Sequence, residues 1–265
     1  MYVSPSRVPS DDTYQTTGSG AFDTVESFSV LKSKKCELRR DSILRTAERL
    51  FFEKGYDETS IQDILDALSI SKGGFYHYFE SKIALLEEIC RQRASAELEH
   101  IRAELYSGKL NAVQKLNLLL GALHLFNRES PAFTALVLKI SYVDCDVHFR
   151  DQTRSFMLES LRPLVDEVIS AGLADGSFFT RNPGQIGRIL LMLGCDVNDE
   201  ACRILAESPD NPDCVIGIVE LLNAYREAVE NLLGASFGTI SLFDVEHLMR
   251  AFRQTAVELK ILEAK

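Results

Sequence analysis

Residues 60–79 read SIQDILDALSISKGGFYHYF and predict two short helices joined by a tight turn. The first helix would carry one apolar face, because its apolar residues recur at helical spacing: Ile61, Ile64, Leu65 and Leu68. Ser60 and Ser71 stand where each helix would need an N-cap, and Ser69-Ile70 interrupts the pattern between them. The stretch therefore predicts a helix-turn-helix, whose second helix lies in the major groove of DNA while the first crosses the backbone.

A longer amphipathic helix is expected before this unit, from Cys36 onward. Its apolar face consists of Ile43, Ala47, Leu50 and Phe51. Gly55 follows its last turn and can take the left-handed conformation that ends a helix. On the other side, Ser81 is placed to cap a long fourth helix. We predict that residues 36–97 form a small three-helix DNA-binding domain and the start of the helix that leaves it.

The second helix of the motif is expected to bury Ile70 and Phe75 and to leave five positions outside: Lys72, Gly73, Gly74, Tyr76 and His77. Two glycines at a helix start cost roughly 1 kcal/mol each relative to alanine. They are easier to understand if the backbone must closely approach another surface. Tyr78 and Phe79 are expected to be core aromatics. His77 could either pack in the core or lie exposed toward the groove.

The run from Arg40 to Leu86 resembles the DNA-binding domain of the TetR (tetracycline-repressor-like) regulators. The resemblance rests on three segments in the right order and spacing: ILRTAERLFFEKGYDETSIQDIL from Ile43, SISKGGFYHYF from Ser69 and ESKIALL from Glu80. It implies a dimeric, sequence-specific DNA-binding transcriptional regulator, a repressor by family habit, that an unidentified small-molecule effector releases from double-stranded DNA. The C-terminal two-thirds of the chain carries no matching motif.

The same resemblance implies which residues meet the DNA. Tyr76 and Lys82 would contact phosphates, Thr59 and Ser60 would lie near the backbone, and four residues would lie close to the groove: Lys72, Gly73, Gly74 and His77. Simpler interpretations exist, since Lys82 can be a solvated lysine and Thr59 and Ser60 can serve only as caps. The recognition helix contains neither Arg nor Asn. Phosphate contacts and DNA shape should therefore matter more than bidentate base readout.

The chain has 265 residues and a net charge of -10, which excludes a protein that holds nucleic acid along its whole surface. Basic residues gather from Lys32 to Arg40 and suit either a DNA-contacting arm or a solubilising stretch. Residues 1–35 are rich in Ser, Thr, Gly, Pro and Asp, and we expect them to form a flexible tail. Six dispersed cysteines, no signal-peptide core and no long apolar run favour a cytoplasmic protein that does not span a membrane.

Residues 98–265 are expected to form a helical bundle for effector binding and dimerisation, which makes the fold all-α. The predicted helices, separated by Pro and Gly breaks, span residues 110–128, 131–143, 150–172, 184–206, 212–233 and 242–263. Dimerisation has its own motive, because a symmetric pair places two recognition helices in successive major grooves about 34 Å apart. The interface is expected on 184–206 and 212–233, and 242–263 either adds to it or covers the bundle.

An effector pocket is expected within residues 110–180. The candidate ligand-binding residues are His124, Phe126, Phe133, Tyr142, Phe156 and Phe178, although aromatics at helical spacing are more often core. The cluster Asp144, Cys145, Asp146 and His148 has metal-ligand residue types without a recurring ligand pattern, so no metal or cofactor is predicted.

Two other functions are the alternatives to a DNA-binding regulator. The sequence contains no G-x-x-x-x-G-K-[ST] loop, no H-E-x-x-H and no dinucleotide-binding turn, so it offers no candidate catalytic site and we predict that it is not an enzyme. A helical adaptor that binds protein through the same motif would need an apolar exposed recognition face. Lys72, Gly73, Gly74 and His77 are instead polar or small.

Overall fold

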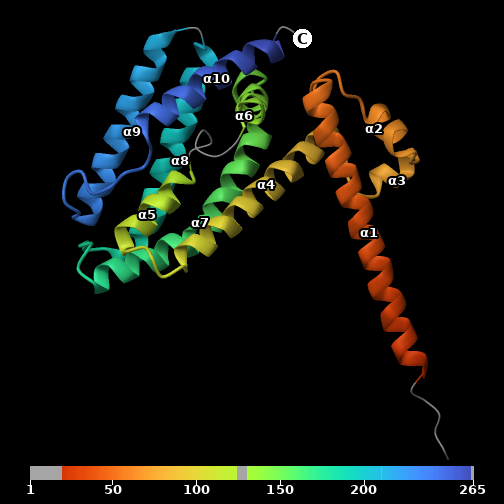
Figure 1. Ribbon diagram of the computed structural model, residues 1–265, viewed down its shortest axis with the longest axis horizontal. Coiled ribbons are helices and arrows are strands. Elements are labelled where there is room, and N and C mark those ends of the chain that lie inside the picture. The colour runs from red at the N-terminus through yellow and green to blue at the C-terminus, as the bar shows by residue number, and fades with distance from the viewer. Residues whose placement is uncertain (1–19, 124–129, 210, 264–265) are drawn as a thin grey trace, which may run out of the picture. The chain divides into compact units, whose positions relative to one another are not determined.

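The computed structural model describes residues 20–123, 130–209 and 211–263, and every regular element in this range is a helix (Figure 1). The prediction of an all-α chain is confirmed. The elements are α1 Gly20–Glu53, α2 Ile61–Leu68, α3 Lys72–Tyr76, α4 Lys82–Leu105, α5 Ala112–Gly121, α6 Pro131–Leu138, the π-helix η2 Lys139–Val143, α7 Val147–Ala174, α8 Pro183–Glu207, α9 Pro212–Leu233 and α10 Val245–Glu263. None of the described helices is long and apolar enough to cross a membrane.

Internal packing divides the chain into two units, Met1–Ile43 and Leu44–Lys265, and α1 runs through the boundary. The sequence predicted a flexible tail over residues 1–35, whereas the structure assigns residues from Gly20 onward to α1; residues 1–19 lie outside the described part. Between Gly20 and Gly55 the sequence contains neither Gly nor Pro. Its Ser and Thr residues lower helix propensity by less than about 1 kcal/mol each, which does not end a helix.

The second unit begins with the helix-turn-helix core. The last turns of α1, helices α2 and α3 and the start of α4 bury one apolar set, each member at most 4% exposed: Leu44, Ala47, Phe51, Ile64, Leu65, Phe75, Phe79, Leu85 and Leu86. The ring of Phe75 lies 6.2 Å from that of Phe79. Because α3 has only five residues, its position depends on this packing more than on its own hydrogen bonds.

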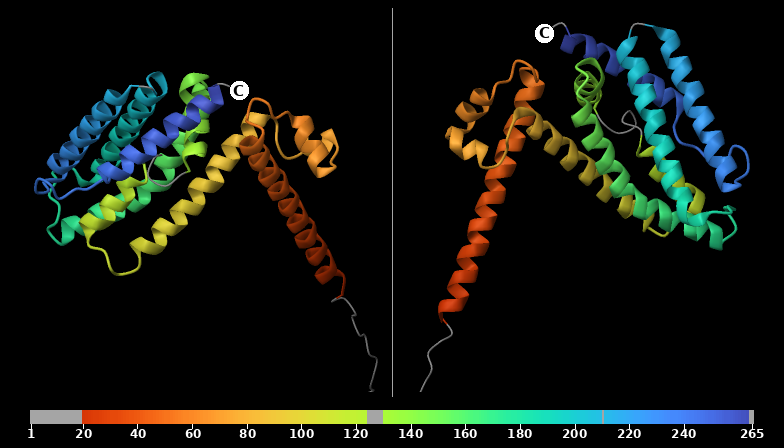
Figure 2. Two further views of the ribbon diagram at one scale, coloured as in Figure 1. Left: turned by 45° about the horizontal axis from the view of Figure 1, so that its top comes forward. Right: turned by 180° about the vertical axis from the view of Figure 1, so that it is seen from behind.

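The remaining helices share one continuous hydrophobic core that runs from Leu98 to Ala256. Helix α7 packs against α4, α5 and α8; α8 packs against α9; and α10 lies across α6 (Figure 2). Helices α8 and α9 approach closely at Gly194, where an added Cβ would lie 2.5 Å from the hydroxyl of Tyr225. That buried hydroxyl donates to the carbonyl oxygen of Leu190 at 2.9 Å and so fastens α9 to α8.

Candidate DNA-binding surface and sensor cavity

Side-chain caps set both ends of the turn between α2 and α3. The Ser60 hydroxyl accepts from the Asp63 amide while the Asp63 carboxylate accepts from the Ser60 amide, which is a capping box. Ser69 ends α2 in the left-handed conformation, with φ 51°. The Ser71 hydroxyl accepts from the Gly74 amide and begins α3. These local hydrogen bonds confirm the predicted boundaries of the helix-turn-helix and fix the direction in which α3 leaves the turn.

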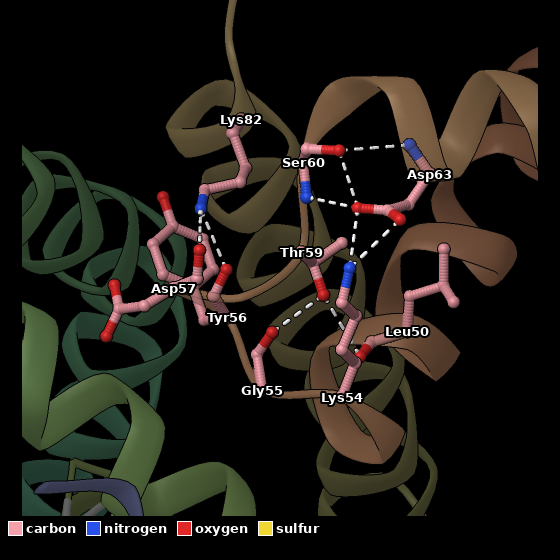
Figure 3. A network of polar contacts seen from close by, with 9 residues as sticks. All are labelled: Leu50, Lys54, Gly55, Tyr56, Asp57, Thr59, Ser60, Asp63 and Lys82. Carbon is pink, nitrogen blue, oxygen red and sulfur yellow. Dashed lines mark hydrogen bonds and ion pairs between the residues drawn. The ribbon is translucent and has the colours of Figure 1, made fainter. Parts of the chain in front are cut away.

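A second polar network joins the end of α1 to the start of α2 (Figure 3). The Thr59 hydroxyl donates to the carbonyl oxygens of Gly55 at 2.6 Å and Leu50 at 3.2 Å, and Thr59 is fully buried. Lys54 lies 2.9 Å from both carboxylate oxygens of Asp63. Hydrogen bonds from Ser60 and this lysine hold the pKa of Asp63 well below its usual range. The network ties the end of α1 to the first turn of α2.

Lys82 belongs to this framework. Its ammonium group donates to the carbonyl oxygens of Tyr56 at 2.8 Å and Asp57 at 3.3 Å, and lies 4.3 Å from the centre of the Tyr56 ring. Burial lowers the pKa of Lys82. The structure thus places Lys82 and Thr59 as positioning residues for the turn before α2, whereas the resemblance implied that Lys82 contacts phosphate.

The outer side of α3 exposes most of the residues expected to meet DNA. Lys72, Gly73, Tyr76 and His77 are exposed, and Gly74 is partly covered. The side chain of Tyr76 is 44% exposed, and the Lys72 ammonium lies 5.9 Å from its ring centre. Phe75 between them is fully buried. The structure therefore brings five predicted contact residues to one short helix and its C-terminal end.

Gly73 is not required by the fold. A Cβ at this position would meet no atom within 4 Å, and its φ is not positive. Alanine would favour the helix by about 1 kcal/mol. No contact within the chain therefore requires glycine at this position. The absence of a side chain leaves the backbone at the start of α3 open to close contact with another molecule.

Replacing Ser60 with alanine should lower the free energy of unfolding by about 1 kcal/mol, because it removes the hydroxyl half of the capping box. Urea unfolding followed by circular dichroism measures the change. Ser236→Ala is the matched control, since Ser236 is exposed and its only described hydrogen bond is made by its backbone oxygen. Equal stability of the two variants would show that Ser60 does not hold α2.

A cavity of about 130 Å³ lies among the C-terminal helices. Residues from α4, α6, η2, α7 and α8 line it, together with Ala122 and Leu123 after α5. Its apolar wall includes Phe133, Val137, Met157 and three cysteines, Cys90, Cys195 and Cys202. Burial raises the pKa of Cys195 to about 11, and that of Cys202 further, so both are neutral thiols at physiological pH. They act as apolar lining.

Four of the predicted pocket residues can be placed. Phe133 and Tyr142 line the cavity. Phe156 lines a smaller neighbouring cavity that shares Cys90 and Met157 with the first. Phe178 is 3% exposed and belongs to the hydrophobic core, and it lines neither of these two cavities. His124 and Phe126 lie outside the described residues.

The sequence analysis missed the polar wall of the cavity. Arg150, Thr153 and Arg154 come from α7, and Asn198 and Asp199 from α8. Arg154 forms ion pairs with Asp196 at 2.6 Å and Asp199 at 2.8 Å, and the Tyr142 hydroxyl donates to Asp199 at 2.9 Å. The helical spacing of Arg150, Thr153, Arg154 and Met157 was the available signal, since it places them on one face of α7.

The cluster from Asp144 to His148 is used for structure. Asp144 pairs with Lys139 at 3.0 Å, and the Asp146 carboxylate caps α7 by accepting from the Phe149 amide. Within the described residues no group of three or more His, Cys, Asp or Glu could hold a metal ion.

Residues 234–238, GASFG, have the letter pattern of a hydrolase nucleophile elbow, a motif that the sequence was expected to lack. An elbow connects a strand to a helix. This segment instead follows the C-terminus of α9, where Gly234 is the left-handed cap. It therefore lacks the structural setting of a catalytic serine.

Comparison with known proteins points to the same N-terminal segment. Residues 43–89 match the family model of bacterial regulatory proteins of the tetR family. The chain is 57% identical over 44 residues to the uncharacterized HTH-type transcriptional regulator YuxN of Bacillus subtilis, across 17% of this chain and 15% of YuxN. Such matches span a minor part of the curated relatives, 15%, 18% and 22% of three of them.

Two longer matches extend beyond that segment. The chain is 26% identical over 168 residues to the HTH-type transcriptional repressor NemR of Escherichia coli, across 61% of this chain and 83% of NemR. A crystal structure of a TetR transcription regulator from Haloarcula marismortui covers 74% of this chain and 99% of its own, with a TM-score of 0.52 and 23% identity. At this identity the structural match shows a shared fold.

Proposed function

Because the chain belongs to the tetR family of helix-turn-helix transcriptional regulators, we propose that it represses transcription as a homodimer that binds operator DNA through α3. The observation that carries the proposal is the exposed side of α3, where Lys72, Tyr76 and His77 surround an open glycine backbone. Lysine and tyrosine can donate to phosphate oxygens, and a bare backbone admits close contact. In this proposal Thr59 and Lys82 position the turn before α2, and Ser60 and Gly74 belong to the DNA-binding surface.

The adaptor alternative finds less support. A protein-binding recognition face would carry exposed apolar side chains at its centre. The described α3 surface offers one aromatic ring beside a lysine, a glycine and a histidine. Membership in a family of regulators also agrees with the prediction that the chain is not an enzyme.

Fluorescence anisotropy on DNA from the protein's own promoter, across a salt series, tests the proposal. We expect salt-sensitive, sequence-selective binding that a Lys72→Ala, Tyr76→Phe double variant weakens at least tenfold. Because a dimer would lose one cationic phosphate contact per subunit, that of Lys72, the slope of log affinity against log salt should become shallower by about 2. Lys109→Ala, an exposed lysine between α4 and α5, is the matched control and should bind as the wild type does. Identical curves for all three proteins would contradict the assignment of α3.

Dimerisation through α8 and α9 is supported by the apolar side chains that these helices leave exposed. Ile189 is 46% and Met192 43% exposed on α8, and Ile216 is 56% exposed on α9. A single recognition helix buries too little surface for typical specific affinity, whereas a two-fold pair doubles it.

An Ile189→Glu, Met192→Glu double variant should convert the protein from dimer to monomer at micromolar concentration, because two buried carboxylates per subunit would oppose the interface. Light scattering after size exclusion measures the mass. Phe179→Glu is the control, since Phe179 is 72% exposed and lies outside both helices. If the double variant remains a dimer, the interface lies elsewhere.

Effector control is supported by a physical path from the cavity to the helix-turn-helix. The π-helix η2 contributes Tyr142 to the cavity wall and, at its first residue, places the Lys139 ammonium 2.9 Å from the carboxylate of Asp57 before α2. π-Helical turns are frequent at functional sites. Arg93 of α4 makes a second link, pairing with Glu48 of α1 at 2.8 Å and lying 4.2 Å from the Phe133 ring centre. A ligand that displaces η2 or α4 would thus shift the population of DNA-competent dimers.

A further inference from the structure

The two arginines in the cavity wall differ in their charge balance. Arg154 is compensated by Asp196 and Asp199. Arg150 forms no ion pair with any residue that the structure describes. Its guanidinium carbon lies 5.6 Å from the centre of the Tyr142 ring, which is a cation–π contact. A half-buried guanidinium without a carboxylate can pair with an anion, and the charge-assisted hydrogen bonds so formed are stronger than neutral ones.

A second polar group in the same wall also lacks a partner. The side-chain oxygen of Asn198 is buried and accepts no hydrogen bond in the described structure. A buried acceptor without a donor is unfavourable, so a ligand that donates a hydrogen bond here would recover part of that cost. Beside the compensated Arg154–Asp199 pair, the wall therefore offers one cation without a carboxylate and one acceptor without a donor.

The size of the cavity limits the ligand. At about 130 Å³ it is close to the engineered apolar cavity of about 150 Å³ that binds benzene. The rings of Phe133 and Tyr142 in its wall suit a flat apolar body.

We propose that the effector is a small hydroxylated aromatic carboxylic acid, whose carboxylate pairs with Arg150 and whose hydroxyl donates to Asn198. This inference rests on the proposed effector site. It adds the ligand class and the two residues that select it. The ring would lie against Phe133 and Tyr142, and contact with Tyr142 would reach Lys139 and Asp57 through η2.

Isothermal titration calorimetry with 4-hydroxybenzoate tests the ligand class on the full chain without DNA. We expect 4-hydroxybenzoate to bind at least tenfold more tightly than 4-hydroxybenzyl alcohol, which lacks the charge, and several-fold more tightly than benzoate, which lacks the donor. Equal binding of the alcohol, tighter binding of decanoate, or no binding of 4-hydroxybenzoate would each overturn the proposal.

Variants locate the site. Arg150→Met should reduce affinity for 4-hydroxybenzoate to that for the alcohol and leave the alcohol unchanged, whereas Arg150→Lys should retain part of the preference for the acid. Arg188→Met is the matched control, because Arg188 is exposed on α8 and does not line the cavity. Circular dichroism verifies the fold of each variant. Wild-type affinity in a folded Arg150→Met protein would overturn the assignment.

Anisotropy on operator DNA separates this inference from the proposed function. If 4-hydroxybenzoate binds but leaves DNA affinity unchanged, the ligand assignment stands and effector control fails. If another molecule releases the DNA while 4-hydroxybenzoate does not bind, effector control stands and the ligand assignment is overturned.

Discussion

Phe75→Ala is expected to lower the stability of the helix-turn-helix by about 3 to 5 kcal/mol and to abolish operator binding. Phe75 is fully buried in a helix of five residues, and its ring contacts that of Phe79. A helix this short has little stability of its own. Losing the ring should therefore release α3 from the core. Hydrogen exchange over residues 61–79 would show faster exchange in the variant, and anisotropy would show the loss of binding.

Tyr76→Ala is the matched comparison, one residue along the same helix. Tyr76 is 44% exposed, so its removal should change stability by no more than about 0.5 kcal/mol. Operator binding should still fall if Tyr76 contacts phosphate. The two neighbours thus separate a structural loss of binding from a direct one. Unchanged hydrogen exchange in Phe75→Ala would show that other contacts hold α3.

The helix-turn-helix could be predicted because its determinants are local. Ser60, Ser71 and Ser81 each cap the helix that follows, as their positions before apolar runs indicate. The left-handed cap at Gly55 follows from glycine's conformational freedom. None of these features needs a distant partner, so the sequence around each residue is sufficient.

The roles of Thr59 and Lys82 could not be predicted in the same way. Thr59 is buried because the turn folds back on the carbonyl of Leu50, nine residues earlier. Lys82 reaches carbonyls of Tyr56 and Asp57, about 25 residues away. Pattern and resemblance give the position of such a residue in the motif, whereas its hydrogen-bond partners depend on how the helices pack.

The cavity shows the same limit. Phe133 and Tyr142 were predicted as ligand-binding candidates because they are aromatic, and they do line it. The groups that would distinguish one ligand from another are polar. Arg150 on α7 and Asn198 on α8 line the same cavity only because these two helices pack together. Long-range packing also decides that Phe178, a candidate by its aromatic character alone, lies in the hydrophobic core.

Gly172→Ala is expected to lower the stability of the protein, because of the way Phe178 packs. A Cβ at Gly172, in the last turn of α7, would overlap the Phe178 ring, because it would lie far inside the ordinary contact distance of the ring carbons. That ring is 3% exposed, and the Phe178 amide donates to the Gly172 carbonyl oxygen at 2.9 Å, so neither partner can move freely. Overpacking of this kind costs about 1 to 3 kcal/mol. The variant should therefore unfold at lower urea concentration than the wild type.

Gly217→Ala gives the opposite expectation for the same chemical change. A Cβ at Gly217, inside α9, would meet no atom within 4 Å, so the variant should gain about 0.5 to 1 kcal/mol from helix propensity. A double variant, Gly172→Ala with Phe178→Ala, should lose less stability than the sum of its single variants, because removing the ring also removes the collision. Additive losses, or a stable Gly172→Ala protein, would show that the end of α7 can yield to admit a methyl group. The contrast between the two glycines tests whether the backbone at Gly172 approaches Phe178 as closely as the structure indicates.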